Sequence, residues 1–239
     1  MEYGVQMYSL RDITEDNLIG ALEAVAQMGY KTVEFAGYFG HSASELRDAV
    51  DKYGLRVVGT HDGCEGLAED FKAAVRFNKE LGNKRYVIPS ASLSTRADLD
   101  RFVDFVNEVS PKLRAEGIEL GYHNHSFEFQ PTEEGYHIHR ELRERTDLFF
   151  ELDTYWAYVA KVDPISELES LRGRVKMIHL KDGTPEGKGL ALGEGSAPVA
   201  AVTRKAIEMG LDIVVESEGC DPTGIDETRR CIEYLKTLA

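Results

Sequence analysis

The chain has 239 residues, of which 42% are hydrophobic and 29% are charged, and its formal net charge is −14. This length lies in the range of roughly 200 to 250 residues in which an α/β barrel forms one domain, and it can bury a core without disulfides. The acidic excess repels polyanions, so we expect neither nucleic acid nor a membrane surface as a partner.

The cysteines and the chain start bear on the cellular compartment. Cys64, Cys220 and Cys231 are widely spaced and form no CxxC pair, which fits a reducing cytosol better than a disulfide framework or a zinc ribbon. The segment Met1 to Arg11 lacks the basic and apolar regions of a signal peptide, and no apolar run approaches the ~18 residues of a membrane span. We expect a cytoplasmic protein, and the sequence leaves a homo-oligomer open.

Short β-rich runs alternate with stretches at helical period about eight times. The predicted strands are Tyr3–Tyr8, Thr32–Ala36, Arg56–His61, Arg85–Pro89, Glu119–His123, Leu148–Asp153, Lys176–Leu180 and Asp212–Glu216. Predicted helices between them include Asn17–Met28, Ser44–Lys52, Leu67–Leu81, Ala97–Ala115 and Val199–Met209. This alternation is typical of βα units and therefore of a parallel sheet.

The glycines support the same units and help to choose between two architectures. Gly29, Gly54, Gly82, Gly117 and Gly210 each follow a predicted helix and precede a strand, the position at which glycine enters the left-handed region most cheaply. A doubly wound open sheet usually carries a glycine-rich phosphate turn after its first strand, and this chain has none there. We therefore predict a single (β/α)8 barrel over residues 1–239.

Two segments interrupt the regular pattern. Ser126–His139 is aromatic and polar, and it predicts a loop or small hairpin over the fifth strand. Gly183–Ser196 contains four glycines, and we expect it to act as a mobile lid.

Polar side chains end several of the predicted strands. In a barrel the C-terminal strand ends meet at one mouth, where catalytic groups lie. The strand ends carry Glu34, His61-Asp62, His123-Asn124-His125, Glu151-Leu152-Asp153, His179-Leu180-Lys181 and Glu216-Ser217-Glu218. A single such residue is most often solvated or capping a helix, but carboxylates crowded together repel one another unless a cation lies among them. The set as a whole predicts a metal or catalytic site.

These motifs resemble those of the xylose-isomerase-like barrels, in particular the sugar phosphate isomerase/epimerase group that includes ketose 3-epimerases and inosose dehydratase. The matching segments are Gly4–Asp12, Gly121–Phe129, Glu151–Trp156, Ile178–Asp182 and Val214–Glu216. Together they span the chain in the order of the family, and none of them identifies a substrate.

The resemblance implies one divalent metal ion held by a Glu, Asp, His and Glu from strands five to eight. Asp153, His179 and Glu216 match their positions, and Glu128 is the predicted first ligand, with His123 or His125 as the alternative. A site of one imidazole and three carboxylates suits Mn²⁺, Mg²⁺ or Co²⁺, and Zn²⁺ is compatible with it.

The resemblance also implies an isomerase or epimerase of a small sugar or polyol, with proton transfer beside a carbonyl. Glu128 and Glu216 are the predicted bases, and Lys181 holds a substrate oxygen, donates a proton or is a rim lysine.

The other predicted roles are in substrate binding. His61, His123 and His125 orient hydroxyls, Trp156 walls the pocket or packs under a helix, and Glu34 binds substrate or fills the barrel floor. Few basic residues end the strands, so we expect an unphosphorylated substrate.

Three alternatives stay open. An enolate with a leaving group at the β carbon eliminates, so a dehydratase or lyase on a keto-inositol or 3-keto-sugar is the second candidate. A non-catalytic sugar-binding barrel is a third. An endonuclease IV-like hydrolase would need a basic face, which the net charge of −14 disfavours.

Overall fold

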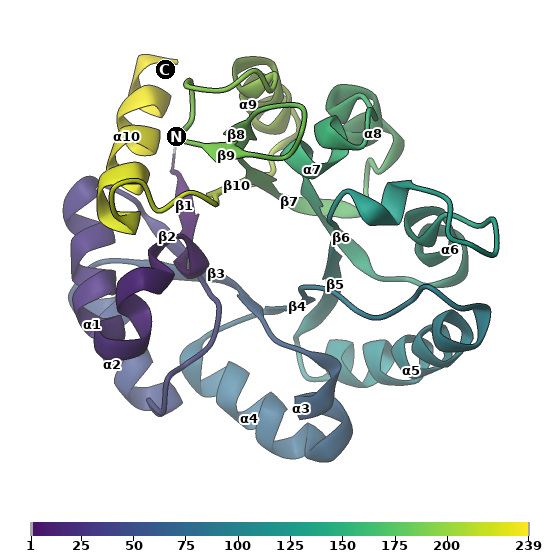
Figure 1. The fold of residues 1–239 in the computed structure, drawn as a ribbon. Coiled ribbons are helices and arrows are strands. Elements are labelled where there is room, and N and C mark those ends of the chain that lie inside the picture. The colour runs from purple at the N-terminus through teal and green to yellow at the C-terminus, as the bar shows by residue number, and fades with distance from the viewer. Residues whose placement is uncertain (1, 239) are drawn as a thin grey trace.

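Eight parallel strands close into a barrel in the computed structural model, which describes residues 2–238 (Figure 1). The strands are β1 (Gly4–Gln6), β2 (Thr32–Phe35), β3 (Arg56–His61), β4 (Arg85–Ile88), β5 (Glu119–His123), β6 (Phe149–Asp153), β7 (Val175–Leu180) and β10 (Asp212–Val215). Each strand pairs with its neighbour in this order, and β10 pairs with β1 to close the ring. The predicted (β/α)8 barrel is confirmed.

Helices surround the barrel and connect the strands (Figure 1). They are α1 (Arg11–Met28), α2 (Ala43–Lys52), α3 (Cys64–Glu69), α4 (Phe71–Leu81), α5 (Arg96–Ala115), α6 (Ile138–Arg145), α7 (Thr154–Val159), α8 (Pro164–Ser170), α9 (Val199–Met209) and α10 (Gly224–Thr237). Short 3₁₀ helices follow β1 (η1, Met7–Leu10) and β5 (η2, Phe127–Phe129). The last helix, α10, lies beside α1, so both ends of the chain meet at one seam (Figure 1).

Local capping explains where the helices differ from their predicted bounds. The predicted helix Leu67–Leu81 is two helices, because Asp70 leaves the helical region and its side chain accepts the backbone N–H of Ala73. The predicted start at Asn17 is a kink inside α1, where the Asn17 side chain accepts the N–H of Gly20. Six further residues of the helix precede it, so α1 begins at Arg11. Gly29 and Gly82 end their helices with φ of 107° and 81°, as predicted.

The barrel interior is layered from an apolar floor to a polar mouth. Val58, Val87, Phe149, Met177 and Val214 form an apolar cluster separate from the main core between strands and helices. Residues two apart on a strand point to the same side, so Glu151, His179 and Glu216, which follow Phe149, Met177 and Val214 by two, lie above the cluster. The sequence therefore places chemistry at the mouth and packing below it.

The loop Gly183–Ser196 is more ordered than a glycine-rich lid implies. It contains an antiparallel pair, β8 (Asp182–Gly183) and β9 (Gly189–Leu190). The buried Asp182 carboxylate accepts backbone N–H groups from Gly183, Gly193, Gly195 and Ala197 at 2.8 to 3.1 Å. These bonds fix both ends of the loop, so only its tip is free of this anchor.

The segment Ser126–His139 forms η2 and a small bridge between Pro131 and His137, in agreement with the predicted loop or hairpin. Among residues 2–238, no helix has the length and apolar character that crossing a membrane requires.

Candidate active site

Six of the predicted site residues line a cavity of about 520 Å³ at the C-terminal ends of the strands. It is lined by Tyr8, Ala36, Gly37, His61, Pro89, His123, His125, Trp156, Lys181, Glu216 and Glu218. Two groups of possible metal ligands lie here within the described chain, and they share His179. The upper group is His123, Asp153, His179 and Glu216, and the lower group is Glu34, His61, Glu151 and His179.

His123 presents a lone pair to the upper group. Its Nδ1 lies 3.2 Å from the carbonyl oxygen of Pro89, and because a carbonyl only accepts, Nδ1 carries the proton. Burial lowers the pKa of His123 to about 4, so the ring is neutral at pH 7 and Nε2 is unprotonated. That nitrogen lies 3.3 Å from Oδ2 of Asp153, and two electron-rich atoms at this distance repel unless a cation is shared between them.

His179 and Glu216 also point at a common region. Nδ1 of His179 lies 2.8 Å from Oε2 of Glu216 and 4.0 Å from Oδ2 of Asp153. Although both partners are buried, neither Nδ1 nor Oε2 has a hydrogen bond of acceptable geometry. Burial opposes protonation of His179, but the charges of Glu151 and Glu216 outweigh it and raise its pKa well above the usual value. His179 is therefore protonated in the metal-free protein, and a metal ion that binds here would displace this proton.

The donor set of the upper group fits a divalent metal ion. Two imidazoles and two carboxylates converge there; within this group Nδ1 of His179 has no hydrogen bond, and Oε2 of Glu216 is paired with the ammonium of Lys181 at 2.5 Å. The predicted ligands Asp153, His179 and Glu216 are together. Glu128 is in neither group, and His123, one of the alternatives left open, provides the fourth donor in this arrangement.

Glu128 lies behind His125. Its Oε2 accepts the backbone N–H of His125 at 2.7 Å, and its Oε1 accepts the hydroxyl of Tyr122 at 3.1 Å. These hydrogen bonds lower the pKa of Glu128, but the effect of burial is larger and raises it to about 7. His125 lines the cavity, its Nδ1 has no hydrogen-bond partner, and that atom lies 4.0 Å from Oε1 of Glu128. Glu128 reaches the cavity only through His125 or after a turn of its own side chain, and its role as a metal ligand stays a prediction.

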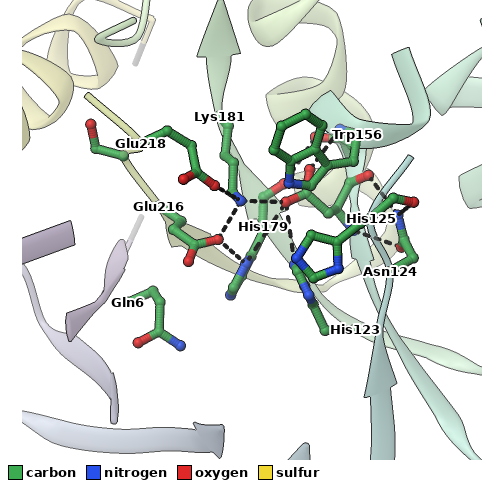
Figure 2. Close-up of polar contacts among 12 residues, drawn as sticks. Gln6, His123, Asn124, His125, Trp156, His179, Lys181, Glu216 and Glu218 are labelled. Atoms are coloured by element: carbon green, nitrogen blue, oxygen red, sulfur yellow. Dashed lines mark hydrogen bonds and ion pairs between the residues drawn. The ribbon is translucent and has the colours of Figure 1, made fainter. Parts of the chain in front are cut away.

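Lys181 is a buried ammonium and not a rim lysine. Its Nζ lies 2.9 Å from Asp153, 2.5 Å from Glu216 and 2.7 Å from Glu218 (Figure 2). Burial favours the neutral amine, but these carboxylates prevail and raise the pKa of Lys181 well above its usual range. The proton on Lys181 is thus held at the cavity wall, and Glu218 is a contact that the predicted roles omitted.

Trp156 forms a wall of the cavity, which decides between the two roles predicted for it. Its ring lies 5.4 Å from Nζ of Lys181 and 6.2 Å from the ring of His125. The backbone N–H of Trp156 donates to Oδ1 of Asp153 at 2.8 Å, so this carboxylate also caps α7. Asp153 Oδ2 is the oxygen that faces the upper group.

Below the upper group lies a polar floor, formed by Gln6, Glu34, His61 and Glu151. Glu34 does not line the cavity, which favours the floor over the substrate contact among its predicted roles, whereas His61 lies in the floor and lines the cavity. His61 Nε2 lies 2.6 Å from Oε2 of Glu151. Sequence reasoning gave Glu151 no role, although its position two residues before Asp153 puts both side chains on one side of β6.

The chain belongs to the family of xylose isomerase-like TIM barrels, which it matches over residues 22–238. Two solved structures from Parabacteroides distasonis, each described as a sugar phosphate isomerase/epimerase, have 28% and 25% sequence identity to it. Both superpose with a TM-score of 0.84 over 98% of this chain, and the matches cover 93% and 97% of theirs. No curated protein matches the chain.

More distant structures share the fold. A D-allulose 3-epimerase from Methylomonas has 14% identity and a TM-score of 0.72, with 100% of this chain and 98% of that chain covered. A probable 3-DHS dehydratase from Bacillus anthracis has 12% identity and a TM-score of 0.81, with 99% of each chain covered. The same fold is thus found in a sugar epimerase and in a probable dehydratase.

Proposed function

We propose that this protein is a divalent-metal-dependent isomerase or epimerase of an unphosphorylated ketose or keto-polyol. The observation that carries the proposal is the convergence of four possible metal ligands at the mouth: His123, Asp153, His179 and Glu216 each offer an atom within 4.8 Å of the others. We infer that His123, Asp153, His179 and Glu216 hold one Mn²⁺, Mg²⁺, Co²⁺ or Zn²⁺ ion. When bound, the ion supplies polarisation of a substrate carbonyl and stabilisation of negative charge on its oxygen.

The side chains around the cavity provide proton transfer from two sides. Glu216 lies on one side and His125 on the other, with His179 between them (Figure 2). Burial lowers the pKa of His125, so the imidazole is neutral and can take a proton from carbon. Glu128 behind it, once ionised, stabilises the imidazolium that results. Epimerisation also requires a proton on the opposite face: the ammonium of Lys181, 2.5 Å from Glu216, supplies it, and the ionised Glu216 removes the proton from that face in the reverse direction.

The walls of the cavity support the proposed substrate class. The indole of Trp156 offers an apolar face to a sugar, while His61 and Lys181 offer hydrogen bonds to its oxygens. Among the lining residues Lys181 carries the one permanent positive charge, and three carboxylates already neutralise it. Arg11 is turned to the backbone carbonyls of Tyr8, Ser217 and Glu218. A phosphate ester would therefore meet Glu216 and Glu218 with no free cation, which supports an unphosphorylated substrate.

A second candidate is elimination, and Lys181 is the observation that favours it. The leaving hydroxyl of a keto-inositol or 3-keto-sugar needs a proton, and the ammonium of Lys181 is held at the cavity wall. The same removal of a proton from carbon would then end in loss of water.

The test is metal analysis of the purified protein, followed by incubation with ketoses, keto-inositols and 3-keto-sugars in D₂O under proton NMR. We expect near-stoichiometric metal, and deuterium incorporation with a new epimer or isomer and no loss of water. An accumulating enone would establish elimination instead. Saturable sugar binding without exchange would establish the binding barrel, and a protein that binds no divalent ion would overturn the proposal.

A further inference from the structure

We infer that the polar floor acts as a positioning device: Gln6 and Glu34 hold the Nε2 proton of His179, so that Nδ1 presents its lone pair to the metal ion. The inference rests on the proposed metal site. It assigns roles to two residues on β1 and β2, strands that do not pair with the ligand-bearing strand β7.

The first step is the orientation of the Gln6 amide. Its Oε1 accepts the backbone N–H of Tyr8 at 3.1 Å. A backbone N–H only donates, so the oxygen of the amide faces Tyr8 and the NH₂ group faces the barrel interior. There Nε2 of Gln6 lies 2.9 Å from Oε2 of Glu34.

The second step follows from the first. Because the Gln6 NH₂ group only donates, Oε2 of Glu34 is an acceptor. The same oxygen lies 2.7 Å from Nε2 of His179, with hydrogen-bond geometry, and Oε1 of Glu151 lies 3.2 Å from that nitrogen. Nε2 of His179 therefore donates its proton to Glu34, and Glu151 lies close to it without a hydrogen bond.

The third step concerns the other ring nitrogen. A neutral imidazole has one N–H, and with the proton held on Nε2 the lone pair is on Nδ1. Nδ1 is the atom without a hydrogen bond, and it faces Glu216 and Asp153. Carboxylates that hold the distal N–H of a ligand histidine fix its ring and increase its basicity toward the metal.

The packing leaves the Glu34 carboxylate little freedom to move away. Glu34 is fully buried, and a Cβ at Gly59 on the neighbouring strand would lie 2.8 Å from its Oε1. Glycine at this position leaves the space that the carboxylate occupies. His61, which is paired with Glu151, closes the floor on the cavity side.

The direct test is the tautomer of His179 in the wild-type protein loaded with Zn²⁺, read by long-range ¹⁵N–¹H NMR and assigned with His179→Gln. We expect the proton on Nε2 and the metal on Nδ1. A metal-bound Nε2, or a second ion in the floor by metal analysis, would overturn the inference.

Variants test the cause. Glu34→Met removes the acceptor, and we expect Zn²⁺ affinity measured by calorimetry to fall by about 10- to 100-fold. Glu34→Gln keeps an acceptor oxygen, so we expect a smaller loss and the same tautomer. The matched control is Glu167→Gln. Glu167 lies 3.7 Å from another buried histidine, His139, and this pair is outside the barrel mouth. The Zn²⁺ affinity of Glu167→Gln should equal that of the wild type.

These outcomes separate the inference from the proposed function. Unchanged affinity and tautomer in folded Glu34→Met would overturn the inference alone. Correct metal binding through Nδ1 without turnover of any sugar would overturn the proposed function alone. A wild-type protein that binds no divalent ion would overturn both, and if Glu34→Met does not fold, the wild-type tautomer still decides.

Discussion

His179 Nδ1 and Glu216 Oε2 lie 2.8 Å apart and are both buried, and the ammonium of Lys181 lies 2.5 Å from the same Glu216 oxygen. Oδ2 of Asp153 lies 4.0 Å from the same His179 nitrogen and 2.9 Å from that ammonium. Neutral His123 faces the same region, so the group can bind a cation. Each of its residues can be tested by a single substitution.

The ligand set is tested by comparing His123→Gln with Glu128→Gln. If His123 is the fourth ligand, its loss should weaken metal binding by about 100-fold or more, beyond the effect typical of an outer partner. Glu128→Gln should keep the metal and lose most of the turnover, because a neutral amide no longer supports a protonated His125. Calorimetry and deuterium exchange measure the two effects. The reverse pattern would make Glu128 the ligand.

Removal of the Lys181 charge should strengthen metal binding. Its ammonium competes for oxygens of Asp153 and Glu216. Unit charges 4 Å apart interact by about 4 kcal/mol at an effective dielectric constant of 20. We therefore expect Lys181→Met to bind Mn²⁺ at least about tenfold more tightly while catalysis falls. Lys176→Met, at the opposite end of β7, is the control and should change neither. Equal or weaker Mn²⁺ affinity in Lys181→Met would contradict the competition.

The pH profile should report the ionisation of Glu128. Activity that needs its carboxylate rises with pH through an apparent pKa near its value of about 7. The Tyr122 hydroxyl lowers that pKa, so Tyr122→Phe should raise it and move the acidic limb of kcat/KM to higher pH. A limb that stays in place in Tyr122→Phe would show that another group controls it.

His139 should make the fold sensitive to acid. Burial lowers its pKa to about 3, with further lowering by Arg143 and Arg174, so the folded protein keeps it neutral while the unfolded chain binds a proton below about 6.5. Stability is therefore lost as the pH falls, by about 2 kcal/mol between pH 6.5 and 4.5. In urea unfolding, the free energy of unfolding of His139→Asn should fall less between these two pH values, because the variant has no histidine at this position to protonate. His137→Asn, a change at an exposed histidine nearby, should keep the full loss.

The anchor at Asp182 should limit the motion of the Gly183–Ser196 loop. Its carboxylate accepts four backbone N–H groups, two of them from glycines late in the loop. Replacement by Ala leaves these donors without partners, so amide exchange at Gly193 and Gly195 should become faster by at least about tenfold. If amide exchange at these glycines is equally fast in the wild type, the anchor does not limit the loop, and the mobile lid predicted from the glycines would be supported.

The fold was predictable because its signals are local. Helix-ending glycines such as Gly29 and the polar strand ends depend on neighbours in the sequence. The site was predictable only as a group of strand ends. Glu34 on β2 faces His179 on β7 only because the barrel is closed, and the two residues are far apart in the sequence. His123 carries its proton on Nδ1 because of the carbonyl of Pro89, which is also distant in the sequence. Glu128 matched the family motif, but its place behind His125 depends on the turn of η2, which no periodicity encodes.

The two oxygens of Asp153 make different contacts: Oδ2 faces the mouth, and Oδ1 accepts a backbone N–H in the first turn of α7. Any pull on the carboxylate by a bound ion is therefore passed to the first turn of that helix, which carries the single tryptophan of the chain. The protein thus has an intrinsic optical sensor, since the emission of Trp156 should respond to occupancy of the mouth without an added dye. For the same reason, replacements at Asp153 disturb the helix and the ion together, and they are the least informative of the ligand variants.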